Sequence, residues 1–373
     1  MTSKARQLAD LGGDTANLED ISSAYSSGAL SNRNLIINSA MQVAQRGTSA
    51  TSVSTEGYKC VDRFRWNMDD TSAVFTLSQS TDVPTGEGFS NSFKAEVTTA
   101  DTSLAAANQI RFEYRFEGQD VQQLAKGTSN AKKVTLSFWV KAFQTGTYVI
   151  NLQDTDNTRL IAATYTVDAS GTWEYKTVTL DGDTSGALTS DANLSLVLHW
   201  YLGAGSNYTS GTLATSWESV TNANRAVGQT VDITASTSNY WAITGVQLEA
   251  GDTATPFEHR SYGAELALCQ RYYIQYDEND EFRAAATATG TTSMEGLVSL
   301  PVQMRTTPTV TTSASIYNIV RGITNANRTI SGTAGTTSKL ISITCAAPSS
   351  TSGTDTGIIY TDTSQFVKCS AEL

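Results

Sequence analysis

Hydrophobic and polar residues alternate with a period of two along several segments of this chain. Between residues 109 and 117 the apolar side chains are Ile110, Phe112, Tyr114 and Phe116, and charged residues occupy the positions between them. Successive side chains of a β-strand point to opposite faces, so this alternation predicts a strand with one buried face and one solvated face. The same pattern recurs at residues 134–140, 148–152 and 194–202. Turn-forming clusters separate these segments, which predicts an antiparallel sandwich.

The pattern changes at residues 241–273, which we interpret as a boundary between two β-rich regions. A strand interrupted at Gly245 is predicted first, Pro256 then ends regular pairing, and residues 263–273 are predicted to form a short helix. Three residues would share one face of that helix: Leu266, Cys269 and Tyr273. Further short strands are predicted after the helix, between residues 282 and 373.

The length and composition support this division into parts. A chain of 373 residues is too long for one average core, and its 39% hydrophobic content is sufficient for burial. We predict a mostly β protein, in which an antiparallel sandwich is followed by a short helix and a second, smaller β-sandwich domain. The predicted boundaries are 1–32 for an N-terminal segment, 33–262 for the first sandwich, 263–281 for the helical connector and 282–373 for the C-terminal domain.

The formal net charge of −11 carries information about partners. Binding to nucleic acid requires a basic stripe, and the basic residues of this chain are scattered, so we predict no nucleic-acid partner. No apolar run has the length of a membrane span or of a signal peptide, so we predict no membrane insertion and synthesis in a cytoplasm. Since only 16% of residues are charged, hydroxyls and amides must cover most of the surface. Such a surface is suited to binding sugars. The alternative is a surface that binds no ligand, which would have the same composition.

The four cysteines are too widely spaced for metal-binding motifs and too few for a disulfide scaffold. We predict that all four are free and mostly buried, and a pairing of Cys345 with Cys369 stays open. The sequence Asp181-Gly182-Asp183-Thr184 offers alternating oxygens to calcium but lacks a full calcium loop, so an ordinary acidic turn is favoured and no metal or cofactor is predicted. Calcium binding at this turn stays open as the alternative.

Several segments resemble those of phage tail-fibre and other virion structural proteins. They are NLIINSAMQVAQRGT at residues 34–48, QLEAGDTATPFEHR at 247–260, GAELALCQRYY at 263–273 and LPVQMRTTPTVT at 300–311. In YKCVDRFRW, residues 58–66, Phe64 occupies the place of the family's tryptophan, and Trp66 stands two residues later. Leu35 and Ile37 alternate as in a strand. The opening KARQLADLGG is similar to the N-terminal starts of phage fibres.

This resemblance implies a protein of the virion that is made in the host cytoplasm without a signal peptide. It implies a homotrimer that docks on other phage tail or baseplate proteins through residues 1–32. It also implies attachment to host surface polysaccharide, with the C-terminal domain as the candidate receptor-binding tip.

A second resemblance concerns the middle of the first domain. TLSFWVKA at residues 135–142 and TWEYKTVTL at residues 172–180 resemble strands of carbohydrate-binding-module-like jelly rolls. In those folds the two strands face each other across the two sheets, and the resemblance implies the same arrangement here. It also implies that residues 33–262 form an antiparallel jelly-roll sandwich.

Aromatic residues beside polar ones are the candidates for ligand contact, because a sugar ring stacks on a flat apolar face while its hydroxyls bind polar groups. In the first domain Trp139, His199 and Tyr201 would form such a platform, unless a loop or a neighbouring subunit covers them. In the second domain the candidates are Tyr317, Tyr360 and Phe366, for each of which core packing is the alternative.

No catalytic residue is predicted. Glycan hydrolysis requires a pair of suitably spaced carboxylates, and the acidic clusters of this chain lie in predicted turns. The neighbourhoods of His199 and His259 lack the motif of a serine hydrolase. We therefore predict a non-enzymatic tail fibre that attaches the particle to a host glycan. The alternatives are a glycan-cleaving depolymerase or hydrolase, and a capsid-decoration or baseplate-side protein.

Overall fold

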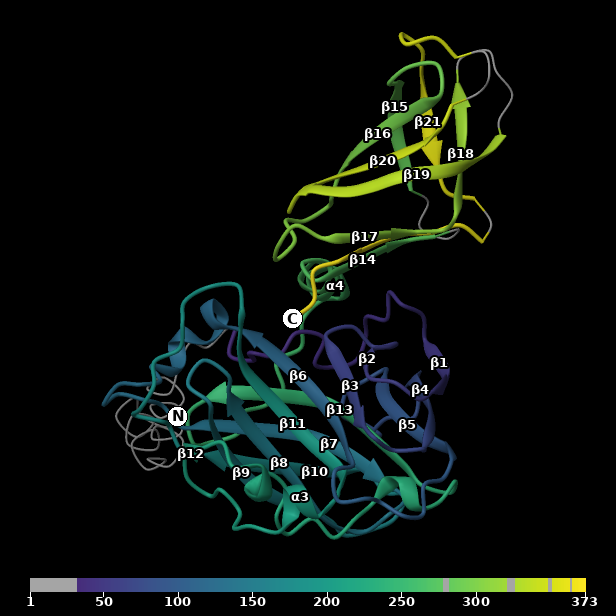
Figure 1. The fold of residues 1–373 in the computed structure, drawn as a ribbon. Coiled ribbons are helices and arrows are strands. Elements are labelled where there is room, and N and C mark those ends of the chain that lie inside the picture. The colour runs from purple at the N-terminus through teal and green to yellow at the C-terminus, as the bar shows by residue number, and fades with distance from the viewer. Residues whose placement is uncertain (1–31, 278–281, 321–325, 348–350, 363) are drawn as a thin grey trace, which may run out of the picture.

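The computed structural model describes residues 32–277, 282–320, 326–347, 351–362 and 364–373. The predicted N-terminal segment therefore lies outside the described residues, apart from Asn32. The structure is 45% strand and 8% helix, which confirms the mostly β prediction. Figure 1 shows a larger β-body formed by the first part of the chain and a smaller one formed by the last part, with helix α4 between them.

The larger body is a sandwich of two antiparallel sheets. The six-stranded sheet has the order β1 (Ser49–Val53), β4 (Val74–Ser80), β5 (Ser92–Thr99), β13 (Tyr240–Ala250), β7 (Val134–Ala142) and β10 (Glu174–Leu180). The seven-stranded sheet has the order β12 (Glu218–Ser219), β9 (Arg159–Val167), β8 (Gly146–Asp154), β11 (Leu194–Ala204), β6 (Gln109–Glu117), β3 (Phe64–Asp69) and β2 (Gly57–Tyr58). Short helical turns lie in the loops of the larger body: η1 (Gly118–Leu124), α3 (Ser206–Thr209), η2 (Asn222–Asn224) and η3 (Ile233–Ala235).

Aromatic rings fill the space between the two sheets. The ring of Phe112 on β6 lies 4.3 Å from that of Phe93, 5.4 Å from Trp241 and 5.8 Å from Trp200, measured between centroids. All four side chains are buried, as the alternation along β6 predicts for Phe112. Phe112 therefore contacts both sheets at the centre of the core.

The opposite face of β6 differs from the prediction. We expected its charged residues to be solvated, yet Glu113 is 1% exposed and Glu117 is 0% exposed. Glu113 lies between the guanidinium groups of Arg65 and Arg115, at 3.2 and 3.3 Å, and Glu117 binds Arg271 at 2.7 Å. The prediction of a solvated face is wrong because ion pairs and neighbouring segments cover these carboxylates.

Two local expectations are also wrong. Strands β7 and β10 are hydrogen-bonded neighbours in one sheet, with Trp139 paired to Tyr175, so they do not face each other across the sandwich. Residues 34–37 form no strand, because the amides of Asn34, Ile36 and Ile37 donate to side chains, and only that of Leu35 donates to a backbone carbonyl. The side chain of Asn34 makes two of the local contacts. Its Nδ2 donates to the Val246 carbonyl at 3.0 Å, and its Oδ1 accepts from the amide of Ile36 at 3.0 Å.

The connector begins with helix α4 (Tyr262–Gln270), whose first turn is capped by Ser261. The helix is shorter than predicted, because Tyr273 already belongs to strand β14 (Tyr273–Tyr276). Strand β14 pairs with β22 (Val367–Ser370), which also pairs with β17 (Thr309–Thr312). A three-stranded sheet thus joins the connector to the C-terminal end of the described chain.

The rest of the second domain is a closed barrel instead of the expected sandwich. Its strand order is β15 (Arg283–Ala288), β16 (Ser293–Ser299), β20 (Leu340–Ala346), β19 (Ala326–Thr337), β18 (Ser315–Val320) and β21 (Thr356–Tyr360). The sheet closes because β21 pairs with both β15 and β18. Small interior residues permit this narrow barrel: a Cβ added at Gly296 would lie 2.9 Å from the Cβ of Ala284.

The four cysteines are free and buried, as predicted, so Cys345 and Cys369 do not pair. Within the described ranges, no helix has both the length and the apolar character needed to cross a membrane.

Substitution of the central aromatic ring tests this packing. We expect Phe112→Ala to lower the free energy of unfolding of the sandwich by about 3–5 kcal/mol, because it leaves a cavity between the sheets. Phe143→Ala is the control, because Phe143 is 45% exposed, and it should change stability by less than about 0.5 kcal/mol. All 6 tryptophans lie in the sandwich, so urea unfolding followed by tryptophan fluorescence reports on this domain. Equal effects of the two substitutions would contradict the assignment.

Candidate functional site: a cleft between the two domains

One carboxylate fastens the second domain to the first. Glu372, next to the last residue of the chain, accepts from Arg63 at 2.8 Å and from Arg46 at 2.9 Å. The side chain of Arg63 is 1% exposed, and Arg46 also lies 3.3 Å from Asp62. We call Glu372, Arg46, Arg63 and Asp62 the Glu372 clamp. It holds the C-terminal end of the chain against the sandwich.

Two tyrosines reinforce the clamp. The guanidinium carbon of Arg63 lies 3.4 Å from the ring centroid of Tyr272, and that of Arg46 lies 3.5 Å from that of Tyr273. A desolvated cation over an aromatic face is stabilised by the ring quadrupole. Tyr272 directly precedes β14 and Tyr273 is its first residue, so the same arginines fix the connector and the C-terminal end.

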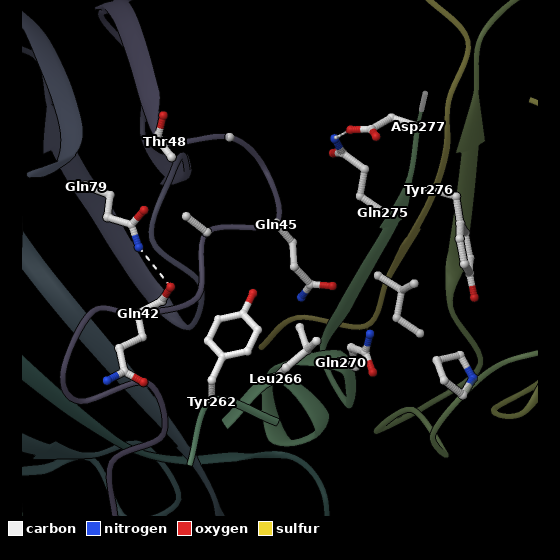
Figure 2. Close-up of a pocket in the computed structure, with 14 residues that line it drawn as sticks. Gln42, Gln45, Thr48, Gln79, Tyr262, Leu266, Gln270, Gln275, Tyr276 and Asp277 are labelled. Carbon is white, nitrogen blue, oxygen red and sulfur yellow. Dashed lines mark hydrogen bonds between the residues drawn. The ribbon is translucent and has the colours of Figure 1, made fainter. Parts of the chain in front are cut away.

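A cleft of about 750 Å³ opens beside the clamp, between the sandwich, α4 and β14. Figure 2 shows the 14 residues that line it. Five of them are glutamines: Gln42, Gln45, Gln79, Gln270 and Gln275. The volume lies in the range of known small-ligand sites.

The lining of the cleft is polar and nearly uncharged. Asp277 is the one acidic residue among the described residues of the lining, which include no basic residue. An amide offers both a carbonyl acceptor and an NH₂ donor, so five amides present complementary partners for hydroxyl groups. Tyr262, which is 57% exposed, and the half-buried Leu266 add apolar surface from α4.

Two of the glutamines are held in place by the protein. Gln45 donates through Nε2 to the Tyr273 carbonyl at 2.7 Å and to Asp62. Gln79 donates through Nε2 to the carbonyls of Met41 and Gln42, at 2.7 and 3.0 Å. Because these nitrogens are engaged, the amide oxygens of Gln45 and Gln79 are the groups left to accept from a ligand.

The segments that resemble phage proteins meet at this junction. Residues 34–48 contribute Gln42 and Gln45, helix α4 contributes Gln270, and the segment that starts at Leu300 contributes Pro301. The Arg305 amide donates to the Arg271 carbonyl at 2.8 Å, which ties that last segment to the connector. The glutamines were missed as site residues because they come from separate segments and form no motif of their own.

The aromatic candidates from the sequence lie elsewhere. Trp139 is half-buried on the outer face of the six-stranded sheet, where its ring centroid lies 5.4 Å from that of Tyr175. Tyr175 is 46% exposed and was not among the predicted contacts. Together these two rings form an aromatic surface that is separate from the cleft.

His199 and Tyr201 lie on the outer face of the seven-stranded sheet. His199 is 3% exposed and lines a second, charged groove. Tyr201 is 0% exposed and packs with Ala214 and Ala226, so a loop covers it, which was the alternative interpretation of this residue.

The C-terminal candidates are partly brought together. Tyr317 and Tyr360 pair across β18 and β21, and their rings stack with centroids 5.7 Å apart. The ring of Phe366 lies 4.4 Å from the Lys368 ammonium, beside the three-stranded sheet. Two of the three candidates, Tyr317 and Tyr360, therefore lie together on the barrel.

The acidic turn at residues 181–184 has protein partners. Asp183 lies 2.6 Å from Arg159 and 3.0 Å from Lys126, so its carboxylate is balanced by two cations. Among the residues placed in the structure, no group of three histidine, cysteine, aspartate or glutamate side chains is arranged to hold a metal ion.

Comparison with known proteins gives structural neighbours only. No family model matches the chain, and no curated protein does. The enzymatically active domain of bacteriophage CBA120 tailspike protein 4 aligns at 14% identity and a TM-score of 0.29, over 54% of this chain and 21% of that chain. A family 11 carbohydrate-binding module of a cellulosomal cellulase from Clostridium thermocellum aligns at 12% identity and a TM-score of 0.27, over 56% and 100%.

A third neighbour, TmCBM61 in complex with beta-1,4-galactotriose, aligns at 8% identity and a TM-score of 0.29, over 59% of this chain and 99% of that chain. These TM-scores and identities are low, so the function has to be inferred from the residues of the chain itself.

The clamp makes the stability of the protein depend on pH. Burial raises the pKa of Asp62 to about 7, although Arg46 and Gln45 oppose the shift. A carboxyl with a higher pKa in the folded chain keeps a proton that the unfolded chain, with a pKa of about 3.9, has released. The contribution of Asp62 is therefore present at low pH and is lost as the pH rises from about 4 through about 7.

We expect the free energy of unfolding to fall between pH 5 and pH 7.5, and to fall less in Asp62→Asn. Urea titration followed by tryptophan fluorescence measures this free energy at each pH. The exposed Asp252 gives a matched control, and Asp252→Asn should keep the slope of the unsubstituted protein. An unchanged slope in Asp62→Asn would show that Asp62 is not the titrating group.

Proposed function

We propose that this chain is a non-enzymatic tail fibre of a virion that binds a neutral glycan on the host surface in the cleft between its two domains. The observation that carries the proposal is the lining of the cleft. Among the described residues, the lining combines five amides and exposed aromatic surface with a single carboxylate, in a volume of about 750 Å³. Hydroxyl-rich, uncharged ligands match this chemistry better than ions or apolar molecules do.

The placement of the phage-like segments supports the assignment to a virion. These segments form one connected unit at the junction, where they close the sandwich and orient the second domain. Glu258 accepts from the Asn34 amide at 2.9 Å, and Arg260 donates to the Ile36 carbonyl at 3.1 Å. Their resemblance to fibre proteins thus concerns the part of the molecule that sets its architecture.

A fibre would use several copies of the cleft at once. We infer a homotrimer that is anchored to tail or baseplate proteins through residues 1–32, with the second domain presented outward. Three linked sites convert weak binding of a single sugar unit into firm attachment, because the second and third contacts are intramolecular.

The absence of an enzymatic role is part of the proposal. Hydrolysis of a glycosidic bond requires two carboxylates about 5–10 Å apart. The described lining of the cleft offers only Asp277, which accepts from Gln275 at 3.2 Å. A depolymerase is the competing function, and it predicts new sugar ends where a fibre predicts none.

Substitution at the cleft tests the proposal. We expect Tyr262→Ala to weaken binding of immobilised host polysaccharide about tenfold, or about 1.4 kcal/mol, because it removes the exposed aromatic face on which a sugar ring would stack. Tyr175→Ala removes a similarly exposed tyrosine outside the cleft and should leave binding unchanged.

The oligomeric state is tested separately. In light scattering, the unsubstituted protein should have the mass of three chains of 39.8 kDa.

Three results would contradict parts of this proposal. Equal losses in Tyr262→Ala and Tyr175→Ala would remove the cleft as the site. A monodisperse monomer would remove the trimer. New reducing or unsaturated ends after incubation with the polysaccharide would replace the fibre with a depolymerase.

A further inference from the structure

A second polar groove lies on the outer face of the seven-stranded sheet, and it shares no lining residue with the cleft. Its volume is about 370 Å³, and strands β6, β8 and β11 form its floor. Three arginines line it, Arg111, Arg115 and Arg225, together with one buried carboxylate, Glu113. We call it the arginine groove.

Glu113 cannot balance the positive charge of this groove alone. Its carboxylate lies 3.3 Å from Arg115, 3.5 Å from Arg111 and 3.2 Å from Arg65. Two more carboxylates stand at the rim: Asp69, 3.5 Å from Arg111 and 37% exposed, and Glu56, 2.6 Å from Arg65 and 50% exposed. The floor therefore keeps more guanidinium than carboxylate, in a protein whose net charge is −11.

Several polar atoms of the groove are buried without a hydrogen-bond partner in the described part of the chain. They are Nε of Arg111, Nε of Arg115 and Oε1 of Gln109. A buried donor without an acceptor is unfavourable, because its hydrogen bonds to water are lost and not replaced. The terminal nitrogens of these arginines already donate within the protein: Arg111 to Oδ1 of Asn67 at 2.9 Å, Arg115 to the Leu373 carbonyl at 2.8 Å and Arg225 to Oε1 of Gln153 at 2.7 Å. A ligand carboxylate would add a charge-assisted acceptor to these neutral ones.

His199 adds an acceptor to the same groove. Asn151 donates through Nδ2 to the Arg225 carbonyl at 3.1 Å, which turns its Oδ1 toward Nδ1 of His199 at 2.7 Å. Nδ1 therefore carries the proton, and Nε2 presents a lone pair. Burial, together with Arg111 and Arg225, lowers the pKa of His199 well below its usual value, so the ring is neutral at pH 7.

Nε2 of His199 faces a second acceptor. It lies 3.5 Å from Oε1 of Glu113, and neither atom can donate to the other while the histidine is neutral and the carboxylate is ionised. A hydroxyl group placed in the groove would donate to one of these atoms. The groove thus provides cationic groups beside one acceptor, Nε2 of His199, for which the described residues supply no donor.

We propose that the arginine groove binds an acidic sugar, whose carboxylate accepts from the arginines and whose ring hydroxyl donates to His199 Nε2. A simple inorganic anion would balance the charge of the arginines and leave Nε2 of His199 without a donor. A neutral sugar would leave the excess positive charge of the groove unbalanced. This site is independent of the neutral-glycan cleft, and either can exist without the other.

Calorimetric titration of the full chain with methyl glucuronide tests the proposal, with methyl glucoside and sodium sulfate as comparison ligands. We expect the glucuronide to bind at least about tenfold more tightly than either comparison ligand. Arg225→Gln should remove this preference, because it deletes a half-buried guanidinium at the groove. Lys132→Gln removes one exposed positive charge elsewhere and should leave the preference intact.

Two further variants keep the result interpretable. Arg225→Lys retains the charge but loses the planar fork, so it should bind the glucuronide with intermediate affinity. Tyr262→Ala in the cleft should bind it as the unsubstituted protein does, which separates this site from the proposed attachment site. Equal affinity for glucuronide and glucoside, equal affinity for sulfate, or an equal loss in Lys132→Gln would each overturn the proposal.

Discussion

The carboxylate of Glu372 is the interaction on which the arrangement of this molecule depends. It is shared by Arg46 and Arg63, which belong to the start of the sandwich, and it comes from the far end of the chain. Removal of one member of a buried ion pair leaves the partner charge without compensation, at a cost of about 3–5 kcal/mol. Arg305 strengthens the same contact, because it donates to the carbonyls of Ala371 and Glu372 at 2.7 and 2.9 Å. The end of the chain is thereby held from both domains.

The cleft is a consequence of that clamp. Its walls come from three separate parts: the loop around Gln42 and Gln45, helix α4, and strand β14. Gln45 belongs to both structures, since it binds Asp62 of the clamp and also lines the cleft. A ligand in this position would contact both domains, so the orientation of the domains determines whether the site exists. The arginine groove differs in this respect, because the sandwich alone forms it.

The sequence predicted the elements whose pattern is local. Residues 109–117 form a strand as expected, Gly245 marks the interruption in β13 with a φ of 60°, and the helix begins near Gly263. Periodicity failed where side chains replace backbone pairing, as at Asn34, and where distant residues cover a polar face, as at Glu113 and Glu117. Periodicity also did not predict that the barrel closes, because closure depends on which strands pair with β21.

The candidate sites were predicted less well than the fold. His199 lines a groove and Tyr317 meets Tyr360, but Tyr201 is covered by a loop, and none of the six candidates lines the cleft. An exposed aromatic residue is visible in a sequence, whereas a set of glutamines is not, because they form a site only after separate segments fold together. The phage-like segments were the available signal, since they contain Gln42, Gln45 and Gln270.

The distribution of distances between the two domains shows most directly whether the Glu372 clamp sets their orientation. Spin labels attached through Thr177→Cys on the sandwich and Thr356→Cys on the barrel, both at exposed positions, can be measured by pulsed dipolar spectroscopy. The native cysteines are buried and should not take the label. We expect one narrow distribution in the otherwise native chain, and a broad one when Glu372→Ala is introduced. A distribution that stays narrow and unshifted in Glu372→Ala would contradict the claim that the clamp sets the orientation of the domains.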